Sequence, residues 1–193
     1  MIEMGKLNEL VVSKKESHGF TLSCENGDTA YLPTKYAPNE LGVDDKITVF
    51  IYKDSDDNLI GTTETPKILL NQFAYLRVIS TTRDGTYLDM GIEKDLFVPE
   101  NRQSKNLYED DLALTYLSLD DWKNKLIGST KIAPFLDQEN ITVKPKEKVE
   151  LLVFSVTDMG AKVIINNIHE GLLYENEIYQ SVEIGDKLVG YIK

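Results

Sequence analysis

The sequence predicts an all-β protein built from tandem small barrels, and three observations lead to this prediction. The 193-residue chain repeats itself, each copy divides into short strand-like segments separated by turns, and the composition is that of an ordinary folded protein. Hydrophobic residues make up 41% and charged residues 27% of the chain, close to globular averages and far from those of disordered proteins. We therefore expect the whole chain to fold.

An internal repeat is the strongest of these signals. A shift of 141 residues aligns residues 10–52 with residues 151–193 without a gap. About two or three identities are expected by chance over an alignment of this length, so a larger number indicates a true repeat. Eight pairs are identical: Leu10/Leu151, Val12/Val153, Gly19/Gly160, Asn26/Asn167, Leu32/Leu173, Asp45/Asp186, Lys46/Lys187 and Ile51/Ile192.

A middle copy lies at a shift of 66 residues. Leu10, Val12, Gly19, Leu22 and Pro33 then fall on Leu76, Val78, Gly85, Leu88 and Pro99. After Pro99 we expect the shift to become 67. One extra residue in a loop of the second copy would account for the change. On that alignment Asp44 and Ile47 fall on Asp111 and Leu114, and residues 59–63 fall on residues 126–130.

In each copy, short segments rich in β-branched residues are separated by turns, which predicts β-strands. In the third copy these strands are residues 149–156, 161–165, 171–174 and 187–192. The first copy adds a fifth, 59–63, after a hairpin at 54–58, and the second does the same after a hairpin at 120–124. Five short strands with a longer connection between the third and fourth are typical of an OB-type barrel.

The fold class is therefore all-β, with tandem five-stranded OB-type barrels of which the third lacks its last strand. We place the repeats at 1–66, 67–137 and 138–193, the last truncated. The third copy reaches Lys193, the counterpart of Tyr52, before any equivalent of the fifth strand. A barrel without that strand has open edges, so we expect either that the chain is a fragment of a longer protein or that a partner supplies the strand.

Motifs in the third copy resemble the RNA-binding motif of ribosomal protein S-one. The segments 158–163 (DMGAKV), 169–178 (HEGLLYENEI) and 184–187 (IGDK) follow that motif's D-F-G-A-F-V turn, E-G-L-V-H-x-S-E-I strand and V-G-D-x-V turn. The middle copy, at 83–91 and 93–99, is similar to the second repeat of the bacterial conserved virulence factor B (CvfB, or YitL-like) family. Residues 31–33 and 61–67 fit that family's opening repeat.

The resemblance covers essentially the whole chain and implies a function. The family is expected to have three OB-type domains followed by a winged-helix domain and to act as a bacterial, RNA-preferring regulator linked to virulence. No winged-helix segment occurs in these 193 residues, so the chain matches the N-terminal two thirds of the pattern. Binding that depends on the remaining third is not implied for this chain.

The resemblance also implies candidate binding residues. In the motif, exposed aromatic residues flank Gly-Ala in the second strand and a histidine ends the third strand, positions from which bases can be stacked. Carried over, these positions are Met159, Lys162 and Tyr174 in the third copy, where Lys162 would pair with phosphate. The second copy has Asp84, Tyr87 and Pro99, and the first has His18, Thr21 and Pro33. Tyr174 and Tyr87 suit a structural role as partly buried tyrosines as well as base stacking, and His18 suits a structural role in a turn.

Charge is unevenly distributed along the copies. The chain carries a net charge of −11, which excludes a histone-like protein held on nucleic acid by phosphate neutralisation alone. The first repeat contributes −6, the second −2 and the third −3. Binding is therefore expected in the later repeats, where the cations to consider are Arg77, Arg83, Arg102 and Lys105, unless these only solvate the surface. Trp122, in the second hairpin, suits base stacking, partner anchoring or packing between barrels.

Catalysis is not predicted. The acid pairs Asp44–Asp45, Asp56–Asp57, Asp110–Asp111 and Asp120–Asp121 all fall at turns, which favour aspartate for backbone hydrogen bonding. Two histidines and one cysteine give no zinc spacing, no nucleophile motif and no phosphate loop, so we expect no metal, no cofactor and no enzymatic activity. The single Cys24 forms no internal disulfide, and no signal peptide or membrane span is apparent, which favours the cytoplasm.

Two functions follow from these features. The first is weak binding of single-stranded RNA by the third and second repeats, through Met159, Lys162, Tyr174, Tyr87, Arg83 and His18, in the control of gene expression. The alternative is a protein-interaction scaffold whose acidic barrels dock on the transcription or translation machinery. Fold class does not decide between them.

Overall fold

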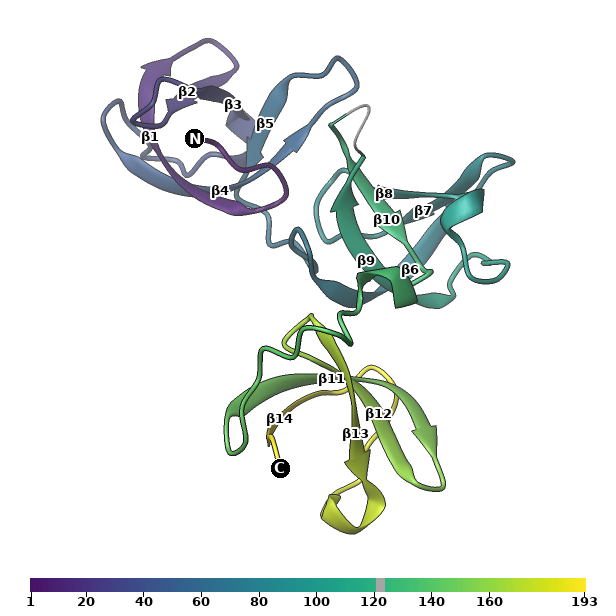
Figure 1. Cartoon of the computed structure of the whole chain (residues 1–193). Coiled ribbons are helices and arrows are strands. Elements are labelled where there is room, and N and C mark those ends of the chain that lie inside the picture. Colours follow the sequence, from purple (N-terminus) through teal and green to yellow (C-terminus); the bar gives the residue numbers. More distant parts are fainter. Residues whose placement is uncertain (121–123) are drawn as a thin grey trace.

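The structure, a computed structural model, describes residues 1–120 and 124–193 and contains three β-units arranged along the chain (Figure 1). All fourteen strands of this part belong to one of three sheets, and its helical segments are 3-10 turns of three residues each. Within the described residues we find no helix with the length and apolar character needed to span a membrane. The expected all-β class and tandem barrel arrangement are confirmed.

The first unit is a closed five-stranded barrel with the order β1-β2-β3-β5-β4. The last strand closes it, because β5 pairs antiparallel with β4 and parallel with β3, where Tyr31 lies opposite Ile60. Alternate residues of each strand point inward, so Val12, Leu22 and Leu32 are fully buried in the interior. The strands are β1 (Leu7–Lys15), β2 (Gly19–Ser23), β3 (Thr29–Pro33), β4 (Lys46–Lys53) and β5 (Leu59–Thr62).

The second unit is a nearly closed barrel with the order β10-β9-β6-β7-β8. Strands β8 and β10 run close together, but no backbone ladder joins these two fully described strands. Its strands are β6 (Phe73–Thr81), β7 (Gly85–Leu88), β8 (Leu96–Pro99), β9 (Leu112–Leu119) and β10 (Leu126–Ser129).

The third unit is an open sheet of four strands with the order β13-β12-β11-β14, as expected for a barrel lacking its fifth strand. Its core of Val149, Val153, Ala161 and Val163 occupies the concave side of the sheet. The strands are β11 (Lys148–Thr157), β12 (Gly160–Ile165), β13 (His169–Tyr174) and β14 (Lys187–Tyr191).

One detail of the expected repeat alignment is wrong. We expected the shift to change to 67 before the fourth strand, which pairs Ile47 with Leu114. In the structure Leu10 lies opposite Ile47 and its counterpart Leu76 lies opposite Ala113, so the shift of 66 continues through β9. The shift becomes 67 only between β9 and β10, and on β9 it is Ala113 rather than Leu114 that points into the barrel.

A glycine opens the second strand of every unit at a point where two backbones nearly touch. These residues are Gly19, Gly85 and Gly160. A Cβ on Gly19 would lie 2.4 Å from the carbonyl oxygen of Leu32 on the next strand, and the corresponding distances are 2.4 Å and 2.1 Å in the other two units. No side chain fits there, so glycine is required by the close approach itself.

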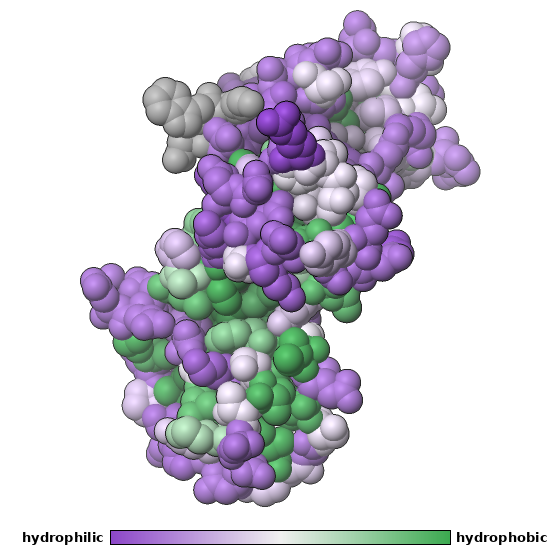
Figure 2. Space-filling view, turned by 90° about the vertical axis from the view of Figure 1, so that its right-hand side faces the viewer, coloured by the Kyte–Doolittle hydropathy of each residue, from purple (hydrophilic) through white to green (hydrophobic). Residues whose placement is uncertain are grey.

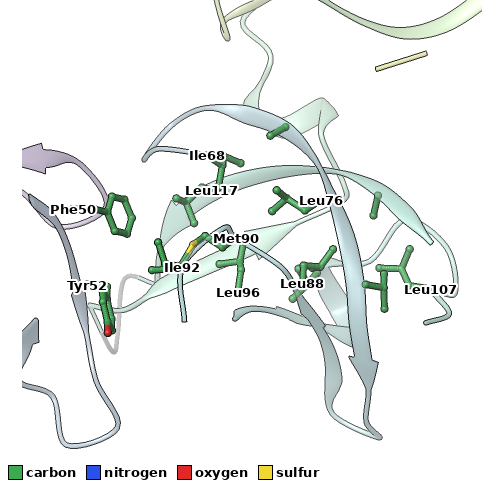
Figure 3. Packing of buried hydrophobic residues seen from close by; sticks show 14 of the residues in the cluster. Phe50, Tyr52, Ile68, Leu76, Leu88, Met90, Ile92, Leu96, Leu107 and Leu117 are labelled. Carbon is green, nitrogen blue, oxygen red and sulfur yellow. The ribbon is translucent and has the colours of Figure 1, made fainter. Parts of the chain in front are cut away.

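Residues of the first unit take part in the hydrophobic core of the second. Strand β4 is buried on both faces, because Val49 and Ile51 point into the first barrel while Phe50 and Tyr52 pack against the core of the second. Figure 3 shows Phe50 and Tyr52 extending from the first unit toward Met90, Ile92 and the neighbouring residues of the second. Burial of these two rings makes the pair of barrels one packed body.

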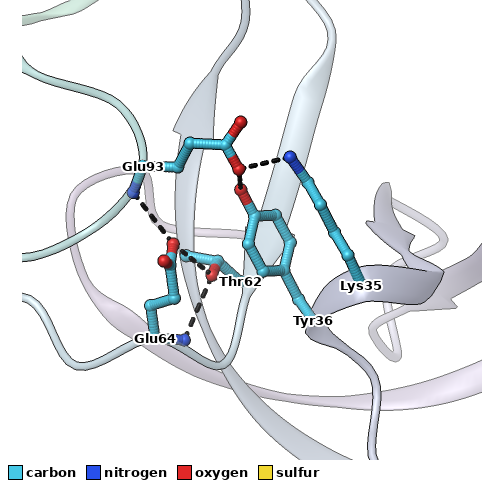
Figure 4. Close-up of polar contacts among 5 residues, drawn as sticks. All are labelled: Lys35, Tyr36, Thr62, Glu64 and Glu93. Carbon is cyan, nitrogen blue, oxygen red and sulfur yellow. Dashed lines mark hydrogen bonds and ion pairs between the residues drawn. The ribbon is translucent and has the colours of Figure 1, made fainter.

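Polar contacts reinforce this junction around Glu93 (Figure 4). The Glu93 carboxylate accepts hydrogen bonds from the Tyr36 hydroxyl and the Lys35 ammonium of the first unit. The Glu93 backbone N–H donates to the Glu64 carboxylate at 2.9 Å. Burial and the bond to Glu93 raise the pKa of Tyr36 to about 12, and the Lys35 and Tyr36 donors lower the pKa of Glu93.

The second and third units meet through aromatic residues. The rings of Tyr116 and Phe135 stack with centroids 4.1 Å apart, and Phe73 contacts Tyr116 at 4.7 Å. Leu152 and Ile164, on the convex face of the third sheet, are buried in the same cluster. The Phe73 N–H also donates to the Asn167 side-chain oxygen at 2.9 Å, so this part of the third sheet is covered by its neighbour.

We expect Gly19→Ala to destabilise the first barrel by about 1–3 kcal/mol, because the added methyl group must displace the backbone at Leu32. Native-state hydrogen exchange of amides in β1–β5 measures this loss. The control is Gly42→Ala, whose Cβ would meet only the Asp45 carboxylate at 3.5 Å, and it should change stability by less than about 0.5 kcal/mol. Equal protection in the two variants would contradict the close-contact requirement.

We expect Glu93→Gln to lower the melting temperature at pH 7 by weakening the bonds to Lys35 and Tyr36. The pKa of folded Glu93 lies below its ordinary value of 4.5, so its stabilising contribution is present above that pH and is lost as the pH falls through the lowered pKa. The difference from wild type should therefore shrink on acidification from pH 5 to pH 3, as thermal unfolding followed by circular dichroism would show. The control is Glu100→Gln, at an exposed site of the second unit. A difference in melting temperature between Glu93→Gln and wild type that does not change with pH would contradict this ionisation effect.

Candidate nucleic-acid-binding surfaces

The three residues predicted in the third unit lie on its outer face and its adjoining turn. Lys162 of β12 is paired with Leu172, and Gly160 with Tyr174, so Lys162 and Tyr174 share one side of the sheet. Met159 is 67% exposed in the turn before β12, and Tyr174 is half exposed at the end of β13. Met159 and Lys162 line the same groove, of about 700 Å³, and Tyr174 lies outside its lining.

That groove, which we call the acidic groove, carries more negative than positive charge. It is lined by Met159, Lys162, Asp137, Gln138, Ile141, Thr157, Asp158, Glu170, Gly171 and Leu172. The Lys162 ammonium lies 3.3 Å from the Glu170 carboxylate on the adjacent strand. A phosphate would therefore have to compete with Glu170 for Lys162, which weakens the expected phosphate role.

The second unit places Tyr87 on a better-developed surface. Tyr87, on β7, is 36% exposed, and it lies opposite Phe97 of β8 with the ring centroids 5.1 Å apart. Of the other predicted residues of this unit, Pro99 ends β8 opposite Gly85, and Arg83 and Asp84 are exposed in the turn before β7. Two adjacent aromatic rings form a platform on which a base can stack.

A groove beside this platform carries three lysines, and we call it the lysine groove. It has a volume of about 370 Å³ and is lined by Tyr87, Phe97, Lys53, Lys94, Lys125, Tyr52, Met90, Asp95, Leu96, Pro99, Asp120, Leu126 and Ile127. Lys94 lies 5.9 Å from the centre of the Tyr52 ring, and burial together with nearby Lys125 lowers the pKa of Lys94. Lys125 pairs with Asp57 at 3.1 Å. An anion entering the groove would relieve the repulsion between Lys94 and Lys125.

The residues of the lysine groove were largely missed by the sequence analysis. Phe97 could have been found from the pairing of β7 with β8, because that register places it directly opposite Tyr87. Lys53 ends β4, Lys94 lies between β7 and β8, and Lys125 directly precedes β10, so nothing in their spacing indicates that they converge. Only the packing of the first barrel on the second brings Lys53 to this place.

The predicted residues of the first unit do not form a comparable surface. His18 is exposed in the turn between β1 and β2, and its backbone oxygen accepts a hydrogen bond from Thr34. The Thr21 hydroxyl donates to the Glu16 carboxylate at 2.7 Å, and Pro33 is half-buried at the end of β3. The turn role weighed for His18 fits this arrangement.

The other predicted cations are dispersed. Arg77 pairs with Asp110 at 3.4 Å, Arg102 lies 3.3 Å from the Ser118 hydroxyl, and Lys105 borders a different groove between the second and third units. None of these three lines the lysine groove. Trp122 lies outside the described residues.

The acid pairs act in turns wherever the structure describes them fully. Asp44, Asp57 and Asp110 adopt left-handed backbone conformations, with φ near 70°. The carboxylates of Asp45 and Asp111 accept backbone N–H groups three residues earlier, at 2.8 and 2.9 Å. Across residues 1–120 and 124–193, no group of three or more potential ligands is arranged to hold a metal ion.

Comparison with known proteins identifies the first unit and the relatives of the whole chain. The S1 domain family matches residues 4–64. Conserved virulence factor B of Staphylococcus epidermidis is 21% identical over 192 residues, covering 95% of this chain and 64% of that protein. Its Staphylococcus aureus counterpart is 23% identical over 206 residues, covering 97% of this chain and 67% of that protein.

A solved structure supports the same relationship at the level of fold. The crystal structure of a multidomain protein with nucleic acid binding domains from Streptococcus pneumoniae superposes with a TM-score of 0.57 and 18% identity, covering 97% of this chain and 68% of that one. The expected resemblance is confirmed: the chain is a low-identity homologue of conserved virulence factor B over nearly its full length. It spans about two thirds of the length of these relatives.

Proposed function

We propose that this homologue of conserved virulence factor B binds single-stranded nucleic acid, RNA in particular, without catalysing a reaction, and that it acts in the control of gene expression. The second barrel would provide the main contact, through the Tyr87–Phe97 platform and the lysine groove. The third barrel would add a weaker contact through Lys162 and Tyr174.

The observation that carries this proposal is the meeting of two adjacent rings, exposed Tyr87 and half-buried Phe97, with three lysines in one groove. Stacking on aromatic side chains is worth about 1–3 kcal/mol per base and does not depend on base identity. Lys53, Lys94 and Lys125 border the same groove, so a base on Tyr87 and Phe97 would place its phosphates near ammonium groups. This combination of ring and cation is the usual chemistry of single-strand binding.

The net charge of −11 is compatible with such binding because the charge is unevenly spread. The first repeat holds most of the excess acid, whereas the lysine groove is lined by three lysines against Asp95 and Asp120, with Asp57 paired to Lys125 at its border. Burial and nearby Asp89 raise the pKa of Asp95. Binding would then be local and modest in affinity.

The relatives support a nucleic-acid ligand in general terms. The Streptococcus pneumoniae protein is described as having nucleic acid binding domains, and the first unit of this chain is an S1 domain. RNA is the form suggested by the resemblance of the third repeat to the RNA-binding motif. The regulatory role rests on the relationship to the virulence factor B proteins alone.

A protein-interaction scaffold is the second candidate, and the acidic groove favours it. Asp137, Asp158 and Glu170 border this groove, while exposed Ile141 and Met159 give it an apolar surface. A basic and apolar segment of another protein would complement that surface better than a polyanion would. This candidate applies to the third unit and leaves the lysine groove unexplained.

We expect Tyr87→Ala to weaken binding of a fluorescein-labelled 12-nucleotide uridine oligomer by about tenfold, since it removes roughly 1–3 kcal/mol of stacking. Fluorescence anisotropy at 50 mM salt measures the change, and a thymidine oligomer of equal length tests the preference for RNA. Tyr87→Phe should retain most of the affinity. Tyr108→Ala, which removes an exposed tyrosine outside the groove, should bind as wild type does. Equal binding by both alanine variants would exclude the Tyr87 platform.

We expect Lys94→Gln to reduce the salt dependence of binding as well as the affinity. Loss of one phosphate contact lowers the slope of log K against log salt concentration by about 0.7 for a single strand. Lys105→Gln, an exposed lysine outside the groove, should leave the slope unchanged. If the slope for Lys94→Gln equals the wild-type slope, Lys94 does not contact a phosphate of the bound strand.

We expect Glu170→Gln to strengthen RNA binding about two- to fivefold, because it frees Lys162 and removes a negative charge from the acidic groove. The gain should disappear in the double variant Glu170→Gln, Lys162→Ala when both are titrated by anisotropy. An unchanged affinity in Glu170→Gln would show that the third unit does not contact RNA, and would favour the scaffold role for that groove.

A further inference from the structure

A third groove, which we call the junction groove, lies where the second unit meets the third. It has a volume of about 520 Å³, and its walls come from β6, β9, β11 and two connecting segments. Figure 2 shows hydrophobic side chains gathered on the surface around the place where the third unit adjoins the rest of the molecule. The groove is lined by Lys105, Lys131, Ser104, Thr130, Tyr75, Leu107, Leu112, Ala113, Leu114, Ile132, Ala133 and Phe154.

The junction groove is positively charged although the chain carries a net charge of −11. Of the described residues that line it, two are lysines and none is acidic. Lys131 donates to the backbone oxygen of Asn101 at 2.9 Å, and within the described part of the chain neither Lys131 nor Lys105 pairs with a carboxylate. Lys125 of the lysine groove and Lys162 of the acidic groove are each paired with an acid. A negatively charged ligand would therefore meet two available ammonium groups in the junction groove.

The outer face of the second unit at this groove differs from the same face of the other units. Leu112 is the first residue of β9, and the equivalent strands of the first and third units begin with Lys46 and Lys187. Lys46 pairs with Glu9 at 3.0 Å, so this face of the first unit is charged. In the second unit Tyr75 takes the place of Glu9, and Leu112 is 68% exposed. An ion pair of the first unit is thus replaced by apolar side chains.

Packing on the third unit accounts for only part of this apolar surface. Tyr75 and Leu114 pack against the cluster that joins the two units. Leu112 lies outside that cluster and remains exposed. The half-buried Tyr75 has no hydrogen-bond partner for its hydroxyl among the described residues, and burial raises its pKa. An exposed leucine and an available hydroxyl therefore lie in the same groove as the two lysines, a combination typical of an interaction site.

The side chains of the junction groove indicate which kind of partner fits it. Bases stack on flat rings, whereas the exposed apolar residue here is Leu112, which suits contact with aliphatic side chains. The ammonium groups of Lys105 and Lys131 suit carboxylates. We propose that the junction groove is a docking site for a short segment of another protein in which leucine is flanked by aspartate or glutamate. This proposal concerns a different surface from the proposed nucleic-acid site and does not depend on it.

A synthetic peptide of the proposed composition provides the probe. Fluorescein-labelled SDEDLLEDS should bind in an anisotropy titration and perturb the amide resonances of residues 104–107, 112–114 and 130–133. Two matched peptides separate the contributions, since SDEDSSEDS keeps the charge and SNQNLLQNS keeps the leucines. Each should bind at least about fivefold more weakly than the first peptide. Perturbations confined to residues outside the junction groove would overturn the proposal.

We expect Leu112→Thr to weaken binding of SDEDLLEDS about fivefold, because it removes exposed apolar surface while keeping a residue that suits a strand. The matched control is Leu7→Thr, since Leu7 is 53% exposed on β1 of the first unit and should not affect the peptide. Both variants should melt within a few degrees of wild type, because both leucines are exposed. Equal affinity of the two variants for the peptide would exclude Leu112 as a contact and refute the docking site.

The double variant Lys105→Gln, Lys131→Gln should weaken peptide binding about tenfold at about 50 mM salt. Its control is Lys144→Gln, Lys148→Gln, which removes two exposed lysines of the third unit. Both double variants should bind the uridine oligomer as wild type does, so a failure of RNA binding is a separate result. Loss of oligomer binding without loss of peptide binding in Leu112→Thr would overturn the proposal, as would a wild-type dimer that this variant dissociates and the peptide does not displace.

Discussion

The close contact between the glycine of the second strand and the carbonyl of the third strand organises each unit of this protein. At Gly19, Gly85 and Gly160 the two backbones are too close for any side chain. This contact fixes the register of the second and third strands, because the glycine must lie opposite Pro33, Pro99 or Tyr174. Once the register is fixed, the side chain two residues after each glycine must project from the outer face.

The same constraint explains why three similar units present three different surfaces. The outward positions after the glycines hold Thr21, Tyr87 and Lys162. Thr21 is bonded to Glu16 in the turn before its strand and Lys162 is paired with Glu170, whereas Tyr87 is joined by Phe97. The scaffold is repeated while the chemistry at one site differs, so the resemblance of the third copy to a binding motif does not make that copy the best site.

The sequence was sufficient to predict features that depend on spacing within one unit. The repeat, the all-β class, the open third sheet and the turn role of Asp45 and Asp111 all follow from residues close together in the chain. The position of the extra residue was misjudged, since Ala113 and Leu114 are both apolar and only the observed pairing shows which one points inward.

Features that arise between units could not be predicted in this way. Phe50 and Tyr191 are equivalent, yet Phe50 is fully buried against the second barrel and Tyr191 is 71% exposed. Both residues suit a strand, and neither sequence context shows whether a neighbouring domain covers the outer face. The convergence of Lys53, Lys94 and Lys125 has the same origin, because the three lysines lie in separate segments of the chain and Lys53 belongs to the first unit.

The lysine groove and the junction of the first two units are parts of one arrangement. Tyr52 packs its ring against the core of the second unit and also borders the groove, and the neighbouring Lys53 lines it directly. Glu93, which bonds Lys35 and Tyr36 across the junction, immediately precedes Lys94. The contacts that hold the acidic first barrel in place therefore also set the positions of two of the three lysines. This gives the first unit a structural part in ligand binding even though its own outer face lacks the residues for it.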